Sequence, residues 1–283
     1  MSVAVVTDST ACLPPDIASR YRVSVVPMPV TVNGISGREG VDVTSADVEA
    51  ALGERRVDVS TSRPAPAELA RLYRCLLDQG SAAVVSIHLS GELSGTCDAA
   101  RLAAAEFGDR VIVVDSRNTG MGLGFAVIEA AKAAKRGRGR GQVAMLARQT
   151  AEATRTFFYV DTLEFLRRGG RIGAAQALLG TALSVKPLLH VSDGKVEVRE
   201  KVRTATRALA KLEDLAVAAG REGSVDIALH HLGSSEAAER LAERLAERFG
   251  RQLRHTYVSE VGAVLAAHCG PGLLGVVVNR RLD

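Results

Sequence analysis

AAVVSIHLSGELSGTCDAARLAAAEF, residues 82–107, has the pattern of a strand, a polar loop and a helix. The apolar run 82–87 predicts a buried strand, and the helical spacing over 98–107 predicts the helix. The loop ends in the tetrad LSGT, residues 93–96, directly before that helix. Backbone N–H groups at a helix start have no partner within the helix, and the helix dipole favours negative charge there. This stretch therefore predicts a strand–helix unit with an anion site at its loop.

A second pair of hydroxyl side chains, Thr61 and Ser62, precedes the helical pattern 67–77. Serine and threonine before a helix usually act as N-caps, and a capping box adds Glu or Gln three residues further on. Ser62 is followed at that spacing by Ala65, and Ser94 of the tetrad is followed by Cys97, so neither site has the capping box. Each of the two hydroxyl sites could therefore be an N-cap or an anion-binding site.

Strand patterns alternate with helical patterns through the first half of the chain. This alternation predicts an α/β fold whose N-terminal domain has three layers, α/β/α, around a mainly parallel sheet. Polar loops after such strands gather at one edge of the sheet, where ligands bind. We expect strands at residues 3–6, 23–26, 82–87 and 111–114, and helices at 67–77, 97–107, 124–135 and 142–153.

The second half has more closely spaced strand patterns, which favour antiparallel pairing. Asp193-Gly194 suits the tight turn of a hairpin between two of them. We therefore expect a C-terminal α/β domain with a mainly antiparallel or mixed sheet, with domains at 1–154 and 155–283. Its strands are expected at residues 156–160, 183–191, 196–200, 225–230, 254–258 and 274–278.

The composition indicates a globular chain, since 47% of its 283 residues are apolar. No apolar stretch reaches the roughly 18 residues of a membrane span, and the chain passes directly from Met1 into a strand pattern. We expect a cytoplasmic protein without stable membrane insertion. The four cysteines are scattered without a Cys-x-x-Cys pair, which argues against a disulfide framework and predicts no metal site.

Two glycine-containing stretches could indicate nucleotides or nucleic acids. Residues 120–124, GMGLG, lack the G-x-G-x-x-G spacing of a dinucleotide loop, so we expect no nucleotide cofactor. Residues 135–141, KRGRGRG, could belong to a DNA-binding regulator, but such runs are commonly solvated linkers. The chain has no tryptophan and few aromatic residues for base stacking, so we expect no nucleic-acid partner.

Two further residues could contact an anion. Arg171 follows two glycines, and its planar fork suits a carboxylate or phosphate, with an interdomain salt bridge as an equal alternative. His268 follows the apolar helix pattern 261–267, where a histidine serves either as a helix cap or as a functional group. An acyl hydrolase or transferase would use Ser94 as nucleophile and His268 as base, oriented by Asp8 or Asp115, yet Ser94 lacks the G-x-S-x-G turn.

A set of short segments lies in order along the whole chain. The segments are Thr7-Asp8-Ser9, Val26-Pro27, Thr61-Ser62 before Pro64, residues 93–96, Asp115-Ser116, residues 169–172, Lys186-Pro187, Asp193-Gly194, Lys201 with Arg203, and His268 with residues 270–272. This ordered set resembles the DegV family of fatty-acid-binding proteins from end to end. The family includes the B subunits of bacterial fatty acid kinases.

The resemblance implies two α/β domains that enclose one long-chain fatty acid. Thr61 and Ser94 match the hydroxyls that bind the carboxylate in the family, and Ser62 and Thr96 lie beside them. Arg171 and His268 match an arginine and a histidine that support phosphorylation of the head group. These six positions are the ligand-binding residues that we predict.

The resemblance also implies a lipid-binding protein, or the subunit of a fatty acid kinase that does not bind ATP, rather than an autonomous enzyme. Its ligand would be the fatty acid, with no cofactor, and its partner a separate kinase subunit that forms an acyl phosphate. The chain departs from the family pattern at Arg63 and Ala65, where glutamine and serine are frequent, and at Cys97, where tyrosine is frequent. Arg63 would alter the mouth of the site or the contact with a partner.

Overall fold

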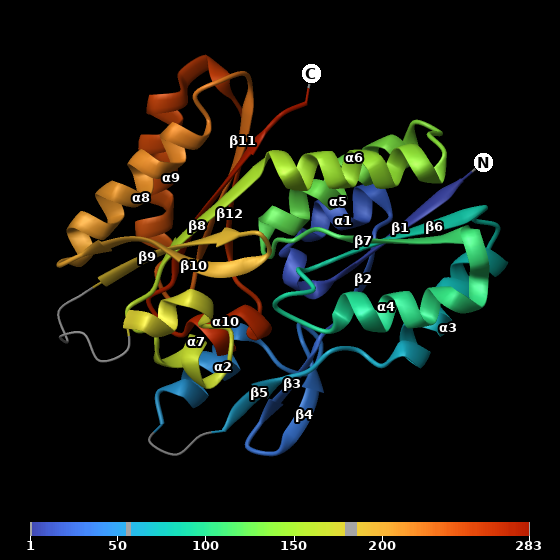
Figure 1. Cartoon of the computed structure of the whole chain (residues 1–283), viewed down its shortest axis with the longest axis horizontal. Coiled ribbons are helices and arrows are strands. Elements are labelled where there is room, and N and C mark those ends of the chain that lie inside the picture. The colour runs from blue at the N-terminus through green and yellow to red at the C-terminus, as the bar shows by residue number, and fades with distance from the viewer. Residues whose placement is uncertain (1, 55–57, 179–185, 283) are drawn as a thin grey trace.

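The N-terminal half is built around a parallel sheet, as predicted. The computed structural model describes residues 2–54, 58–178 and 186–282. Its first sheet has the order β2-β1-β6-β7 (Figure 1), and all its neighbouring strands are parallel. The strands are β1 (Val3–Asp8), β2 (Ser24–Val26), β6 (Ala83–His88) and β7 (Val111–Asp115).

Helices cover both faces of this sheet because its strands alternate their apolar side chains. Val6 and Val84 pack with α3 (Pro66–Asp78) and α4 (Thr96–Ala104), whereas Val5 and Val85 pack with α5 (Met121–Lys135) and α6 (Arg140–Ala153). The predicted three-layer α/β/α arrangement is therefore confirmed. Residues 136–139 of the basic run form the turn between α5 and α6, while Lys135 ends α5 and Arg140 starts α6.

A small antiparallel sheet, which the sequence patterns did not predict, lies beside the first one. Its order is β4-β3-β5, with β3 (Pro29–Val32), β4 (Ile35–Arg38) and β5 (Val59–Thr61). Asn33-Gly34, with φ angles of 51° and 80°, forms the turn between β3 and β4, and this pair was the sequence signal for a hairpin. Helix α2 (Ser45–Leu52) contacts β5 of this sheet, whereas α1 (Pro15–Tyr21) contacts α5.

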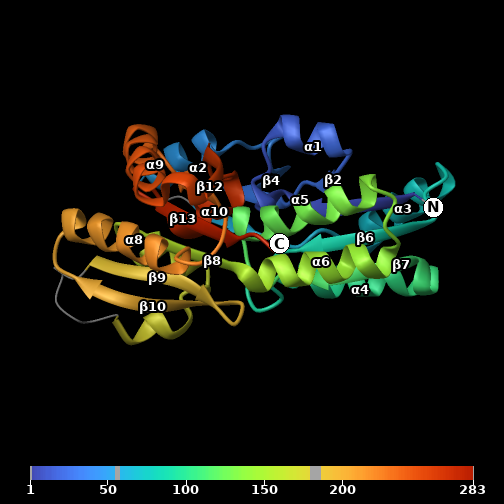
Figure 2. The same ribbon diagram turned by 90° about the horizontal axis from the view of Figure 1, so that it is seen from above.

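The C-terminal half forms a mixed six-stranded sheet, as predicted. Its order is β10-β9-β8-β13-β11-β12, antiparallel throughout except for the parallel pair β11 and β12. Helices α8 (Ala205–Ala219) and α9 (Ser235–Phe249) cover one face (Figure 2). The strands are β8 (Thr154–Tyr159), β9 (Lys186–Ser192), β10 (Lys195–Val202), β11 (Val225–His231), β12 (Leu253–Glu260) and β13 (Leu274–Arg280).

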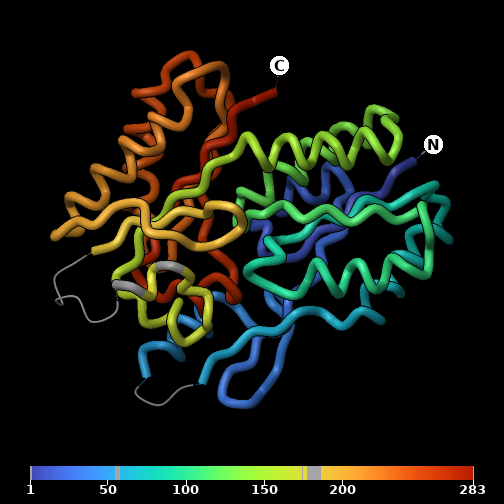
Figure 3. Tube along the Cα trace, viewed as in Figure 1, coloured from blue at the N-terminus to red at the C-terminus, as the bar shows by residue number. Residues whose placement is uncertain are grey.

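The hairpin between β9 and β10 turns at Asp193-Gly194, where both φ angles are positive, as the sequence predicted. The first residues of the strand expected at 183–191 lie outside the described residues. Below the junction of the two large sheets lie the small sheet, α2, α7 (Glu164–Arg168) and α10 (Ala263–Cys269) (Figures 1 and 3). This junction surrounds the site described below.

The hydrophobic core does not stop at the predicted domain boundary. One cluster of buried side chains includes Val5 and Leu123 from the first half together with Phe158 and Leu189 from the second. The end of α6 at Ala153 and the start of β8 at Thr154 coincide with the change of sheet. The division at residue 154 stays a prediction about folding units.

Candidate functional site

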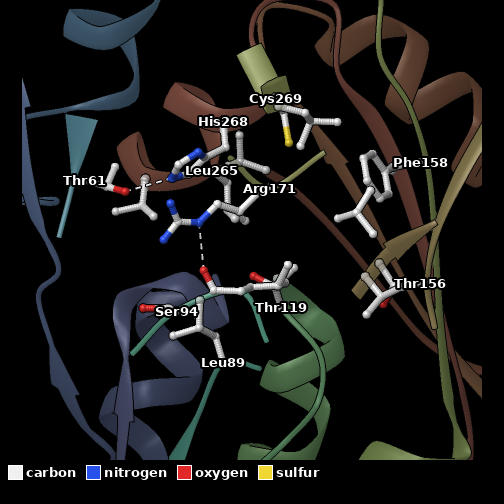
Figure 4. Close-up of a pocket in the computed structure, with 18 of the residues that line it drawn as sticks. Thr61, Leu89, Ser94, Thr119, Thr156, Phe158, Arg171, Leu265, His268 and Cys269 are labelled. Atoms are coloured by element: carbon white, nitrogen blue, oxygen red, sulfur yellow. Dashed lines mark hydrogen bonds between the residues drawn. The ribbon is translucent and has the colours of Figure 1, made fainter. Parts of the chain in front are cut away.

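A cavity of about 280 Å³ lies between the two large sheets, the small sheet and α10 (Figure 4). Most of its wall is apolar, from side chains such as Leu89, Phe158, Val264 and Leu265. Polar side chains from distant parts of the chain line one side of it. This polar group is Thr61, Ser62, Arg63, Ser94, Arg171 and His268, and five of the six predicted ligand-binding residues are among them.

Thr61 and His268 form a direct hydrogen bond across the cavity wall. Thr61 Oγ1 lies 2.8 Å from His268 Nε2. Thr61 is the last residue of β5. Helix α3 starts later, at Pro66, and its N-cap residue Ala65 makes no side-chain hydrogen bond to the helix. The prediction that Thr61 belongs to a helix start was therefore wrong, because a short edge strand holds its hydroxyl instead.

His268 is an uncharged hydrogen-bonding group near neutral pH. It lies in the last turn of α10, not after the helix as the sequence suggested. Burial, and secondarily the charge of Arg171, lowers the pKa of His268 to about 4. Its Nδ1 is buried without a hydrogen-bond partner among the described residues, and a Cβ atom on Gly169 would lie only 2.1 Å from it. Glycine at 169 is thus required for this packing.

Ser94 lines the cavity and hydrogen-bonds to the first residue of the neighbouring helix, whose N-cap position is Gly95. The first residue of α4 is Thr96, whose N–H donates to Ser94 Oγ at 3.3 Å. The two hydroxyl oxygens lie 2.9 Å apart. Thr96 itself is fully buried and does not line the cavity, so it can act on a ligand only by orienting Ser94.

Arg171 is the half-buried cation of the site. Its Nε donates to Leu93 O at 2.9 Å and its Nη1 to Gly169 O at 2.6 Å. Within the described ranges no carboxylate forms an ion pair with this half-buried guanidinium, so an interdomain salt bridge of Arg171 is not observed among those residues. Arg171 lies between His268 and Ser94 and faces the cavity (Figure 4). The arrangement places a positive charge beside three neutral hydrogen-bonding groups, Thr61, Ser94 and His268, on one side of the cavity.

Ser62 and Arg63 form the exposed edge of the site. The guanidinium of Arg63 packs on Gly95, where a Cβ atom would lie 2.7 Å from its Nη1. Arg63 therefore adds a second positive charge at the mouth of the cavity, next to the start of α4.

The residues of a hydrolase triad are not assembled. Ser94 bonds to Thr96, and His268 bonds to Thr61. Asp8 accepts hydrogen bonds from His88 Nδ1 at 2.9 Å and from the N–H of Leu89 at 3.0 Å. The carboxylate of Asp115 is likewise engaged elsewhere, by the N–H groups of Gly91 and Arg117.

The structure adds one buried residue that the sequence patterns did not indicate. Glu39 is only 6% exposed, and its Oε1 accepts the N–H of Val264 in the first turn of α10 at 2.8 Å. Its other oxygen accepts the hydroxyl of Ser9. Burial raises the pKa of Glu39 above its usual value. Glu39 thus fixes the start of the helix that carries His268, although a lone glutamate in a polar stretch gives no such signal.

The glycine run 120–124 has a packing role. A Cβ atom on Gly122 would lie 2.1 Å from Asn118 Oδ1, and one on Gly124 would lie 2.7 Å from Ala11 O. These glycines let the start of α5 approach the neighbouring loop and strand closely.

Among the described residues no group of three or more His, Cys, Asp or Glu side chains is placed to hold a metal ion. None of the helices in the described ranges has the length and apolar character needed to cross a bilayer.

Comparison with known proteins gives matches over nearly the whole chain. The model of the DegV family, described as uncharacterised proteins, matches residues 2–281. A DegV domain-containing protein of Streptomyces coelicolor is 48% identical over 279 residues, which cover 99% of each chain. A second such protein, from Mycobacterium tuberculosis, is 39% identical over 280 residues, covering 99% of this chain and 98% of the relative.

Solved structures also match over nearly the whole chain. A DegV family protein from Thermus thermophilus, described for its fatty acid binding, superposes with a TM-score of 0.94 at 35% identity, covering 99% of this chain and all of the other. DegV from Bacillus subtilis, described as a fatty acid binding protein, gives a TM-score of 0.89 at 30% identity with the same coverage.

Proposed function

The chain belongs to the DegV family, and we propose that it binds one long-chain fatty acid in this cavity and presents the carboxylate to a separate ATP-dependent kinase subunit. The kinase would transfer a phosphoryl group to a carboxylate oxygen and so form an acyl phosphate. Fatty acid binding by the Thermus thermophilus and Bacillus subtilis relatives supports the first half of this proposal.

The single observation that carries the proposal is the position of Arg171. A half-buried guanidinium that faces a cavity, held by two backbone carbonyls, favours an anionic ligand. Hydrogen bonds between a carboxylate and a cation or hydroxyl are shorter and stronger than those between neutral groups. Thr61 and Ser94 provide two such hydroxyls beside the guanidinium.

The apolar wall suits a long acyl chain. Each buried methylene contributes about 0.8 kcal/mol, so a chain of some sixteen carbons gains most of its binding free energy from the tail. The head-group residues then contribute the smaller share of the binding free energy and orient the carboxylate. As phosphate is added, Arg171 would offset the growing negative charge, and neutral His268 would hold Thr61 in place.

The hydrolase alternative receives less support from the geometry. Its nucleophile and base bond to other partners, and neither Asp8 nor Asp115 orients His268. A fluorophosphonate that labels Ser94 covalently would favour the hydrolase, and an unlabelled Ser94 favours the carrier.

Mass spectrometry of the purified protein, native and then denatured, tests the carrier proposal. We expect one fatty acid per chain, released on denaturation and identifiable after extraction. Thr61→Ala combined with Ser94→Ala removes two hydrogen bonds to a charged group and should weaken binding of stearic acid roughly 100-fold. Ser36→Ala, which removes an exposed hydroxyl from the small sheet, is the control and should leave binding unchanged. An empty protein that takes up no added fatty acid would refute the carrier.

A further inference from the structure

The cavity has a second polar region, on the side opposite Thr61, around the start of α5 (Figure 4). Thr119 precedes that helix, Thr156 lies on β8 and His230 on β11. All three line the cavity. Polar side chains at this depth are unexpected beside a purely hydrocarbon tail, because burying a polar group next to apolar atoms is unfavourable.

Most polar atoms of this region already have partners. The N–H of Met121 donates to His230 Nε2 at 2.9 Å, and His230 Nδ1 lies 3.2 Å from Ser259 Oγ. Thr156 Oγ1 donates to Asn118 Oδ1 at 2.8 Å. The next two N–H groups of the helix, those of Gly122 and Leu123, bond to the backbone oxygens of residues 119 and 120.

The hydroxyl of Thr119 is the exception. Its Oγ1 is buried and has no hydrogen-bond partner in the described part of the chain. Because a buried hydroxyl without a partner is unfavourable, a ligand atom that pairs with it would be favoured over a methylene group. Gly275, which carries no side chain, also lines the cavity, and a Cβ atom there would lie no closer than 3.6 Å to any neighbouring atom.

The chemistry of the region suits a neutral oxygen rather than a second carboxylate. The backbone donors of the first turn of α5 are already used, and no cationic side chain of the described residues lines this side. Burial lowers the pKa of His230 to about 4, so its ring is uncharged near neutral pH. Once the Thr119 side chain rotates to turn Oγ1 toward the cavity, one hydroxyl or keto oxygen could bond to it without requiring any of the existing bonds to break.

We propose that Thr119 makes the cavity selective for acyl chains that carry a neutral oxygen, a hydroxyl or keto group, at the position where the chain passes the start of α5. This inference rests on the proposed function, since it assumes that the carboxylate lies at Arg171. It names a substrate class within fatty acids, namely oxygenated ones.

The test compares dissociation constants for stearic acid and for a positional series of hydroxystearic acids. Thr119→Val keeps the shape of the side chain without its hydroxyl, and Thr119→Ser, the matched control, keeps the hydroxyl. The preference for an isomer is the dissociation constant of stearic acid divided by that of the hydroxystearic acid. For at least one positional isomer, this preference should be roughly tenfold greater in the wild type than in Thr119→Val. Thr119→Ser should retain that preference, and Thr119→Val should bind stearic acid at least as tightly as the wild type.

Equal preferences in the wild type and Thr119→Val for every isomer, with stearic acid still bound, would overturn this inference alone. Failure of the wild type to bind stearic acid or any hydroxystearic acid would refute the proposed function and this inference together. Binding of stearic acid reports that each variant is folded. If Thr119→Val does not fold, Thr119→Ala makes the same comparison.

Discussion

Arg171 shows how a single residue can separate ligand retention from chemistry. Its guanidinium contacts the backbone of residue 93 on one side and of residue 169 on the other, so its position depends on two loops. The hydrocarbon tail of the fatty acid, in contrast, would contact the apolar wall of the cavity, to which Arg171 contributes little. Losing the charge should therefore affect the reacting head group far more than the binding of the chain.

For Arg171→Ala we expect a normal yield of bound fatty acid and a rate of acyl phosphate formation reduced roughly 100-fold, the typical cost of losing one group that stabilises developing charge. The yield is measured by mass spectrometry, and the rate with a competent kinase subunit and ATP. Arg207→Ala removes an exposed arginine from α8 and is the control. Unchanged turnover in Arg171→Ala would exclude Arg171 from the reaction.

Among the elements, α10 is decisive because it connects the small sheet to the head-group site. Glu39 lies at its first turn, and His268 in its last turn bonds to Thr61. A carboxylate at a helix start is favourable, but burial opposes its charge, and the net effect raises the pKa of Glu39. The free energy of unfolding should therefore depend on pH through Glu39.

The expected sign follows from the raised pKa. The folded protein holds the Glu39 proton more tightly than the unfolded chain, so this contribution to stability is fully present below the unfolded pKa and is lost as the pH rises through the folded pKa. Glu39→Gln lacks this dependence. Urea unfolding at several pH values should show the free energy of unfolding of the wild type falling relative to Glu39→Gln as the pH rises. A constant difference between the two proteins would contradict the assignment.

At the scale of the whole molecule, the cavity and the core both cross the predicted boundary at residue 154. The buried cluster that contains Val85 also contains Leu189, and the cavity wall takes side chains from both halves. The two halves should therefore unfold together, even though each has its own large sheet.

Hydrogen exchange measures this coupling. We expect the amides of β6, such as that of Val85, and those of β11, such as that of Leu229, to exchange through the same global unfolding, with equal free energies of opening. Both side chains are fully buried. If one strand opens at a clearly lower free energy, the halves are independent folding units, as the predicted domain division implies.

Much of the architecture could be predicted from local patterns. Buried strands such as residues 82–87 are recognisable from apolar runs, and the β9–β10 hairpin from Asp193-Gly194. The small sheet was missed even though Asn33-Gly34 marks its turn, because its strands are short and partly polar. The role given to Thr61 at a helix start was wrong for the same reason, since the strand that carries it was not recognised.

The sequence by itself determined the strands of both large sheets, the helices that cover the first of them, the tight turn at residues 193–194 and, by resemblance, the family. These features depend on periodicity and turn chemistry within a few residues of each other. Only the tertiary structure decided that Thr61 meets His268, 207 positions along the chain, and that the hydroxyl of Thr119 lies buried without a partner. Such contacts arise where separate elements pack together, and packing depends on the whole set of buried surfaces rather than on any local pattern.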